Sequence, residues 1–370
     1  MAELYIGLMS GTSLDGVDAV LVEFGGLQTK VLGHCSAPFP AELKTEFLAL
    51  NTPGVNELHR AALAGNALSR LYAEQIRVLL TKHNTPAAQV RAIGAHGQTV
   101  RHRPQEFDGV GYTLQINQPA LLAELCGIDV VVDFRSRDVA AGGQGAPLVP
   151  PFHQAFFGRP GAAVAVLNIG GISNISVLPT DGVDIIGYDC GPGNALMDAW
   201  CQKHTGQPFD ESGHWAAQGN VNPPLFASLM AEPYFTKVPP KSTGRDLFNT
   251  AWLERLLAAH ADVTPVDVQS TLTEVTAKAC ADSLTASSPC CTNLIVCGGG
   301  ALNLELMRRL QGRLSGCSVE SSAQHGLPPL QVEATAFAWL ARQAIHRETA
   351  SLQCVTGARG ARILGAIYPA

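Results

Sequence analysis

Four short glycine-containing segments hold residues that could bind phosphate. They lie at residues 10–16 (SGTSLDG), 170–174 (GGISN), 191–194 (GPGN) and 298–300 (GGG). Glycine lets backbone N–H groups approach a ligand closely, and clustered N–H groups attract anions. One such turn could merely close a hairpin. Four of them after predicted strands favour a polyphosphate site, because α/β sheets bind ligands at the ends of their strands.

Side chains in the first two segments extend this chemistry. Ser10, Thr12 and Ser13 in the first segment, and Ser173 in the second, can donate an O–H to phosphate oxygens. Asp15 could hold Mg²⁺ directly or through water, since Mg²⁺ prefers carboxylate and phosphate oxygens. We therefore expect Asp15 to be the metal ligand.

The elements around these segments alternate between strands and helices, which predicts an α/β fold. Two hairpins, at 4–24 and 162–178, open two similar halves. A stretch rich in Gly and Pro at 140–151 separates them, so we expect an N-terminal lobe at 1–145 and a C-terminal lobe at 146–370. Other predicted strands are 90–95, 113–116, 128–134, 183–189 and 294–297, and predicted helices are 55–83, 119–127, 194–203, 268–285 and 332–347.

Composition and absent motifs exclude several classes of protein. A net charge of −6 argues against binding of nucleic acid through phosphate neutralisation, and 46% hydrophobic residues argue against disorder. We expect neither a signal peptide nor a membrane span, because the N-terminus lacks a basic region and no apolar run reaches about 18 to 20 residues. The ten cysteines form no CxxC pair, which favours reduced thiols in the cytoplasm. Cys190 stands out among them because it directly precedes the glycine segment at 191–194. The motifs of P-loop, Rossmann, zincin and α/β-hydrolase proteins are missing.

Longer strings make a resemblance specific. They are GLMSGTSLDGVD, GAHGQT, DVAAGGQGAPLVP, NIGGISN, DCGPGNALMDAW, KSTGR and VCGGGALN. Together they resemble the anhydro-N-acetylmuramic acid kinase family of the sugar kinase/Hsp70/actin superfamily, over nearly the whole chain. The resemblance implies a two-lobed actin-like ATPase fold with ribonuclease H-like halves and a nucleotide cleft between the lobes.

The resemblance also implies a reaction. It converts 1,6-anhydro-N-acetylmuramic acid, ATP and water to N-acetylmuramic acid 6-phosphate and ADP, in cell-wall recycling and amino-sugar catabolism. ATP and Mg²⁺ are the implied cofactors. The implied nucleotide contacts are Gly11, Thr12, Ser13, Leu14, Asp15, Gly16, Val17, Asp18, Gly170, Gly171, Asn174, Gly298, Gly299, Gly300 and Asn303.

Such a reaction needs a carboxylate that activates water at the anomeric carbon. Asp189 is our candidate, because it ends a predicted strand just before a glycine turn and a helix, and the resemblance points to it as well. It could instead be a turn or capping aspartate. In simpler sugar kinases of the superfamily the base follows a strand of the first domain, where Asp133 and Asp138 lie here. We expect Asp138 to contact the substrate instead.

The sugar offers a lactyl carboxylate, hydroxyls and an N-acetyl group. Arg135 could bind the carboxylate with two parallel hydrogen bonds, with Arg137 beside it. His96 and Gln98 could bind hydroxyls or the N-acetyl group, and Glu333 could reach the sugar or cap the last helix. Surface or structural roles remain open for each of them.

Lys241 and Arg245 could reach a phosphate or simply line the surface, whereas Asp198 and Trp200 are better placed for capping and core packing. Two other functions remain open: a plain N-acetylhexosamine 6-kinase, and an actin- or Hsp70-like ATPase switch without a sugar substrate. We expect a cytoplasmic enzyme with a small-molecule sugar as its partner and neither nucleic acid nor membrane. The resemblance suggests a homodimer.

Overall fold

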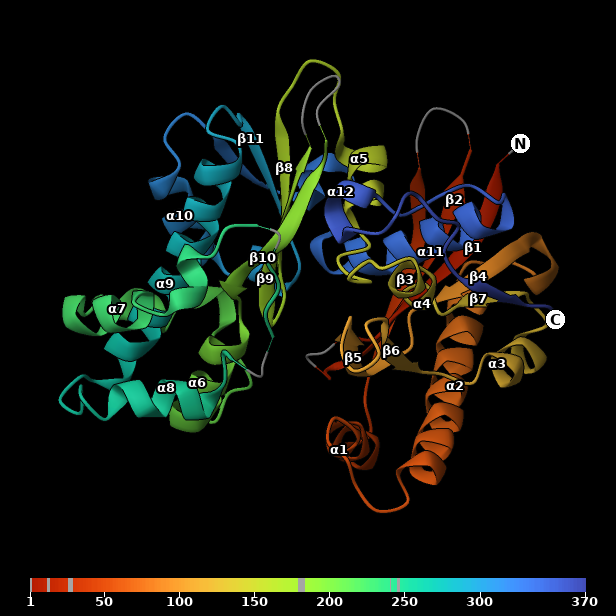
Figure 1. The fold of residues 1–370 in the computed structure, drawn as a ribbon, viewed down its shortest axis with the longest axis horizontal. Helices are drawn as coiled ribbons and strands as arrows, with labels where there is room; N and C mark the ends of the chain where they lie inside the picture. The colour runs from red at the N-terminus through yellow and green to blue at the C-terminus, as the bar shows by residue number, and fades with distance from the viewer. Residues whose placement is uncertain (1, 12–13, 26–28, 179–183, 240, 245–246) are drawn as a thin grey trace. The chain divides into compact units, whose positions relative to one another are not determined.

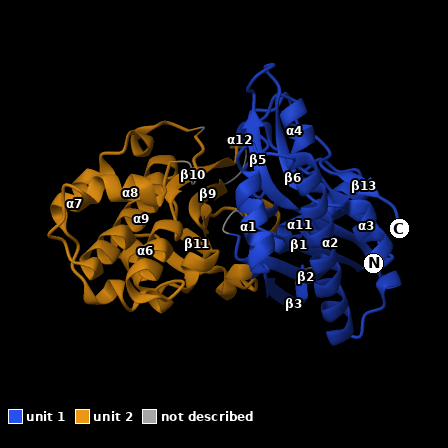
Figure 2. Ribbon diagram, turned by 90° about the horizontal axis from the view of Figure 1, so that it is seen from below, with its two compact units in different colours: residues 1–152, 331–370 blue, residues 153–330 orange. Residues whose placement is uncertain are grey.

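The computed structural model describes residues 2–11, 14–25, 29–178, 184–239, 241–244 and 247–370. Within it the chain forms two compact units (Figure 2). Unit 1 consists of residues 1–152 and 331–370, and unit 2 of residues 153–330. Among the residues described, no helix combines the length and the apolar character needed to cross a membrane.

Unit 1 is built on a mixed sheet with the strand order β13-β7-β4-β1-β2-β3. Strand β2 is antiparallel to both β1 and β3, β4 is parallel to β1 and to β7, and β13 is antiparallel to β7. The strands are β1 (Glu3–Met9), β2 (Gly16–Phe24), β3 (Lys30–Pro38), β4 (Val90–Ala95), β7 (Val130–Val132) and β13 (Ala366–Tyr368). A separate hairpin joins β5 (Gln98–Pro104) to β6 (Gly111–Ile116).

Helices cover both faces of this sheet (Figure 1). The long helix α2 (Glu57–Lys82) buries Leu68, Tyr72, Ile76 and Leu79, whose spacing of three or four residues places them on one face. On the opposite face, α11 (Val332–Ile345) packs its small and apolar residues against β1 and β4. Shorter helices in unit 1 are α1 (Ala41–Leu50), α3 (Pro119–Cys126), α4 (Ser136–Ala140), α5 (Pro150–Phe157), which extends into unit 2, and α12 (Gln353–Thr356).

Two glycines bring α11 unusually close to the sheet. A Cβ on Gly7 would lie 1.8 Å from the carbonyl oxygen of Ala334, and a Cβ on Gly94 would lie 2.0 Å from that of Phe337. Real side chains do not tolerate such distances, so the helix backbone rests directly on β1 and β4. The position of Glu333 in the first turn of α11 depends on this packing.

Unit 2 repeats the same arrangement with the strand order β10-β9-β8-β11-β12. A hairpin joins β8 (Val164–Ile169) to β9 (Ile172–Leu178), as β1 is joined to β2 in unit 1. The other strands are β10 (Ile186–Pro192), β11 (Asn293–Cys297) and β12 (Ser318–Ser321). Its helices are α6 (Ala195–Thr205), α7 (Pro223–Met230), α8 (Thr250–Leu257), α9 (Pro265–Ser287) and α10 (Leu304–Arg313).

The two sheets share one topology. When only the strands of each sheet are counted along the chain, both sheets contain the order 3-2-1-4-5, and β13 extends the first sheet beyond β7. Two such ribonuclease H-like halves in one chain make up the actin-like ATPase fold, as the sequence predicts.

The division of the chain differs from the expected lobes at 1–145 and 146–370. Residues 331–370 belong to unit 1, because α11 packs on β1 and β4 and because β13 pairs with β7. The chain therefore leaves unit 1 near residue 152 and returns to it after residue 330.

Candidate functional site

The first predicted phosphate loop connects β1 to β2. Ser10 is the first residue of this loop, and its Oγ donates to the carbonyl oxygen of Gly97 at 2.9 Å. The side chain of Leu14 is buried, and its backbone adopts the left-handed conformation with φ 58°. Its N–H donates to the carbonyl oxygen of Gly11 at 3.2 Å. The carboxylate of Asp15 is exposed beside it. Thr12 and Ser13 lie outside the described residues.

The start of β2 allows little variation. A Cβ on Gly16 would lie 2.1 Å from the carbonyl oxygen of Ala37 on β3. Val17 is buried in the core, so its side chain points away from a ligand. Asp18 is half-buried and accepts a hydrogen bond from His34 at 2.9 Å.

In unit 2 the second glycine segment is bound to the start of α6. The N–H groups of Gly193 and Asn194 donate to the carbonyl oxygens of Gly171 and Gly170, at 3.0 and 2.7 Å. The hydroxyl of Ser173 donates to the carbonyl oxygens of Gly191 and Pro192. The third segment, at 191–194, is therefore hydrogen-bonded to the turn of the second, at 170–174. The N–H groups of Gly193 and Asn194 and the hydroxyl of Ser173 are engaged within the protein.

The fourth glycine segment, at 298–300, lies beside the second because β8 and β11 are parallel neighbours. A Cβ on Gly298 would lie 2.7 Å from the carbonyl oxygen of Ile169, and one on Gly300 would lie 2.4 Å from the side chain of Ile169. Gly299 is exposed. Asn303 has a structural contact, since its Oδ1 accepts from the N–H of Leu306 at 3.0 Å and caps α10.

Asp189 lies on β10 and is held by the segment that follows α7. Its Oδ2 accepts from the backbone N–H of Thr243 at 2.9 Å, and its own N–H donates to the carbonyl oxygen of Lys241 at 3.3 Å. The hydroxyl of Tyr234 donates to the carbonyl oxygen of Asp189 at 2.8 Å. Burial raises the pKa of Asp189 to about 6, although the Thr243 N–H opposes this. Such a carboxylate is largely ionised at neutral pH and basic enough to accept a proton.

Register places two other polar residues beside this carboxylate. Asn174 on β9 pairs with Asp189 on one side and with Asn168 on the other. Because paired residues share a face of the sheet, the three side chains form a row across β8, β9 and β10. Cys190 points to the opposite face, where it is fully buried and where burial raises the pKa of its thiol.

In unit 1, three of the predicted sugar residues lie close to the first loop. The ring nitrogens of His96 contact the carbonyl oxygen of Ser10 and the guanidinium of Arg135, at 3.1 and 3.0 Å. Gln98 is buried, and its Nε2 donates to the carbonyl oxygen of Gly11 at 3.2 Å. The structure therefore brings His96, Gln98 and Arg135 together with Ser10 and Gly11.

The two predicted carboxylates of unit 1 have different surroundings. Asp138 is completely buried, and its oxygens accept from the N–H of Gly145 and the hydroxyl of Thr356, both at 2.8 Å. Both of its oxygens are thus engaged within the protein. Glu333 is half-buried and its pKa is raised by burial and by Asp18, although the charge of Arg135 opposes the shift.

The other polar candidates lie outside these clusters. Arg137 and Asp133 are exposed, and Asp133 accepts from Ser136. The indole of Trp200 donates to the carbonyl oxygen of Pro265, which is a packing role. Lys241 lies over the ring of Tyr234 at 4.9 Å, and Arg245 lies outside the described residues. Sequence reasoning missed Tyr234, Thr243 and Thr356, and only Thr243, within KSTGR, lay in a motif that it noticed.

Mg²⁺ fits the residues of the first loop. In the described part of the chain, no group of three or more His, Cys, Asp or Glu side chains could enclose a metal ion. Mg²⁺ in phosphoryl-transfer sites needs no such cage, since one or two carboxylates, water and the phosphates themselves complete its shell. The exposed carboxylate of Asp15 meets that requirement.

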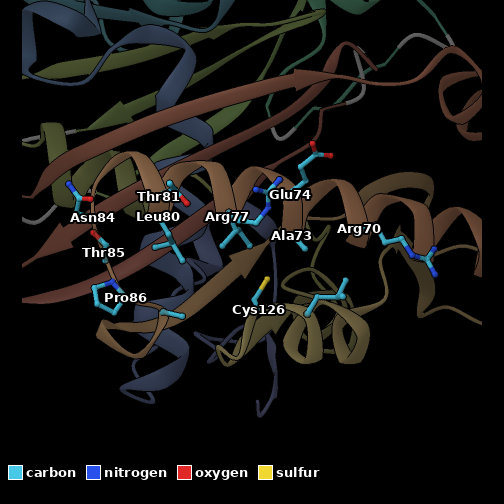
Figure 3. Close-up of a pocket in the computed structure, with 13 residues that line it drawn as sticks. Arg70, Ala73, Glu74, Arg77, Leu80, Thr81, Asn84, Thr85, Pro86 and Cys126 are labelled. Carbon is cyan, nitrogen blue, oxygen red and sulfur yellow. The ribbon is translucent and has the colours of Figure 1, made fainter.

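A hollow of about 770 Å³ lies elsewhere on unit 1 (Figure 3). It is formed by the end of α2, the turn after it and the end of α3, and Arg77, Leu80 and Cys126 are among the residues that line it. None of the predicted site residues lines this hollow. It is therefore separate from both clusters described above.

Comparisons with known proteins agree with the motifs. The chain matches the family model described as anhydro-N-acetylmuramic acid kinase over residues 3–370. It is 65% identical to the anhydro-N-acetylmuramic acid kinase of Variovorax paradoxus (strain S110), covering 100% of this chain and 99% of the relative. Identity to the Bordetella pertussis protein of the same description is 56%, covering 99% and 96%. A solved structure, component A of (R)-2-hydroxyglutaryl-CoA dehydratase from Acidaminococcus fermentans, has 11% identity and a TM-score of 0.49, covering 91% and 96%.

Proposed function

The chain belongs to the anhydro-N-acetylmuramic acid kinase family, and we propose which of its residues carry out each part of that activity. The family's activity is a phosphotransferase reaction on 1,6-anhydro-N-acetylmuramic acid, which serves peptidoglycan recycling.

Asp189 is the proposed general base. It takes a proton from water, and the oxygen of that water bonds to the anomeric carbon as the bond from this carbon to O6 breaks. The freed O6 takes the γ-phosphoryl group of ATP, and ADP leaves. The observation that supports this role is the geometry of the carboxylate: Thr243 holds Oδ2, and within the described residues no hydrogen bond engages Oδ1.

The nucleotide is assigned to the glycine loops. In unit 1 we propose contacts from residues 11–18, and in unit 2 from Gly170, Gly171, Asn174 and residues 298–300. Asp15 would hold Mg²⁺, which when bound neutralises charge on the phosphates. Asn303 supports the last of these loops through its cap on α10.

The sugar is assigned to unit 1. Arg135 is the proposed partner of the lactyl carboxylate, because a guanidinium suits a carboxylate with two parallel hydrogen bonds. Gln98 and Glu333 are proposed to contact the ring substituents. We expect Asp138 to support this region without being the base, because both its oxygens already accept hydrogen bonds.

The assignment of the base is tested with Asp189→Asn and Asp138→Asn. With Mg²⁺-ATP and the anhydro sugar, we expect Asp189→Asn to lower turnover by about 10²- to 10⁴-fold while ATP binding changes little. The fold of this variant should survive, since a carboxylate whose pKa is raised by burial costs stability when ionised. Sugar-dependent ADP and the reducing end of the product are measured together.

Two results would contradict the proposal. One is a larger loss of the chemical step in Asp138→Asn than in Asp189→Asn. The other is a phosphorylated product that keeps its anhydro ring, which would indicate a plain sugar kinase. We also propose a cytoplasmic homodimer, and light scattering of the purified protein at a monomer mass would contradict the dimer.

A further inference from the structure

His96 is a buried titratable residue to which the mechanism above gives no chemical step. Only 5% of it is exposed, and its ring packs against Phe337 of α11 with the ring centres 4.7 Å apart. Nδ1 lies 3.1 Å from the carbonyl oxygen of Ser10. Nε2 lies 3.0 Å from Nη2 and 3.3 Å from Nε of Arg135. Both nitrogens are therefore engaged within the protein, so a direct contact with the sugar is not the simplest role for this ring.

The partners assign the tautomer of His96. A backbone carbonyl only accepts, so Nδ1 carries the hydrogen and donates it to Ser10. A guanidinium only donates, so Nε2 presents its lone pair to Arg135. Burial and the charge of Arg135 lower the pKa of His96 to about 3, which keeps the imidazole ring neutral at physiological pH.

Arg135 keeps two N–H donors that no described contact engages. Two of its N–H groups point to His96, and Nη1 donates to the carbonyl oxygen of Gly145 at 2.8 Å. A guanidinium has five N–H groups, so among the described contacts one N–H remains on each terminal nitrogen. Two donors on the end of a planar group match the two oxygens of a carboxylate.

The turn at residues 96–98 is also hydrogen-bonded to the first phosphate loop. The hydroxyl of Ser10 donates to the carbonyl oxygen of Gly97, and Nε2 of Gln98 donates to the carbonyl oxygen of Gly11. Gly97 has φ 76°, and a Cβ there would lie 2.8 Å from the carbonyl oxygen of Ile116. Residues 96–98 are thus fixed in place, and His96 connects the loop after β1 to Arg135.

We propose that His96 is a positioning residue that holds the guanidinium of Arg135 toward the carboxylate of the substrate and ties it to the first phosphate loop. The proposal rests on the assignment of Arg135 to the lactyl carboxylate. It predicts that the acceptor at Nε2 matters for binding of the acidic sugar, and that the donor at Nδ1 matters for the loop.

Two substitutions separate these contacts. His96→Gln can place an amide oxygen near the site of Nε2 and keep an acceptor for Arg135. His96→Asn can place an amide N–H near the site of Nδ1 and keep the donor to Ser10, but it loses the acceptor for Arg135. His153→Gln, a buried histidine of unit 2 outside the proposed site, is the matched control.

The probes are the anhydromuramic sugar as substrate and 1,6-anhydro-N-acetylglucosamine, which lacks the lactyl group, as a competing ligand. For His96→Asn we expect the KM of the acidic sugar to rise by about 10-fold or more, since a hydrogen bond to a charged group is lost. The KM of ATP and the inhibition constant of the neutral sugar should stay within about 2-fold. His96→Gln should recover most of the affinity, and thermal unfolding should show each variant folded.

The failures are distinguishable. If Arg135→Ala leaves the KM of the acidic sugar unchanged, the assignment of Arg135 is wrong and this inference fails with it. If Arg135→Ala raises that KM but His96→Asn does not, only the positioning role is wrong. Three other results would show a merely structural histidine and overturn the proposal. They are an equal loss of affinity for both sugars, no recovery with His96→Gln, and a His96→Asn protein that is unfolded.

Discussion

At Asp189 one backbone N–H opposes the effect of burial on the charge of the carboxylate. Burial raises the pKa of this group to about 6, and the N–H of Thr243 acts in the opposite direction. A base works only when deprotonated, so kcat/KM should fall on the acid side of that pKa. The acid limb of the pH profile therefore reports how Asp189 is held.

Replacing Thr243 tests this contact. Thr243→Pro removes the N–H that donates to Oδ2, so we expect the pKa of Asp189 to rise further and the acid limb to move to higher pH. Thr243→Ala keeps the N–H and should leave the limb where it is in the wild type. The measurement is kcat/KM between pH 5 and 9. A limb that moves equally in both variants, or in neither, would argue against this account.

Single residues differ in how far their roles could be predicted. Asp189 could be proposed from the sequence because its residue type and its place before a glycine turn both point to chemistry. Thr243 could not, because it contributes a backbone N–H, which every residue type except proline supplies. The contact between Thr356 and Asp138 spans 218 residues of sequence and leaves no local pattern.

At the scale of elements, the contact of α11 with the sheet depends on Gly7 and Gly94. A Cβ at position 94 would lie 2.0 Å from a backbone oxygen of α11, which cannot move without moving the helix. We expect Gly94→Ala to lower the free energy of unfolding by about 1–3 kcal/mol, as overpacked cores do. Urea unfolding of the purified variant measures this.

Gly312 offers a matched control for that substitution. It is exposed in α10, and a Cβ there would have no neighbour within 4 Å. Gly312→Ala should therefore raise stability by about 0.5–1 kcal/mol through its helix propensity. Similar effects from the two substitutions would mean that the close approach of α11 is not what constrains Gly94.

Elements with strong periodicity were predicted well. The helix expected at 55–83 is α2 (Glu57–Lys82), and the strand expected at 90–95 is β4 (Val90–Ala95). Strand β3 (Lys30–Pro38) was missed because it lies at the edge of the sheet, where most of its residues are partly exposed and no apolar alternation is needed. Strand β12 (Ser318–Ser321) is likewise a short edge strand with little apolar character.

At the scale of the whole molecule, the two units differ in continuity. Unit 2 is one stretch of chain, whereas unit 1 needs α11 to cover one face of its sheet. We expect a fragment of residues 153–330 to fold alone and unfold cooperatively, and a fragment of residues 1–152 to remain incompletely folded. Circular dichroism and urea titration of the two fragments test this expectation.

The control is a chain in which a flexible Gly- and Ser-rich linker joins residues 1–152 to residues 331–370. Because it restores α11 and β13, we expect it to fold. Failure of this chain to fold, or native-like unfolding of residues 1–152 without α11, would contradict the role given to the returning segment.

The boundary expected from sequence alone could not reveal this return, because Gly and Pro mark where a chain leaves a unit and carry no information on where it comes back.

The return of the chain to unit 1 also sets an order of events during synthesis. The ribosome releases residues 1–152 first, and the face of their sheet that α11 later covers stays uncovered while the whole of unit 2 is made. The nascent N-terminal part therefore presents Tyr5, Val20 and Val22 to the solvent for the time that translation of about 180 residues takes, roughly 10 to 40 s at bacterial rates. Unit 2 can finish folding in that interval. The N-terminal sheet has to wait, and it is the part of this protein on which a ribosome-associated chaperone would act.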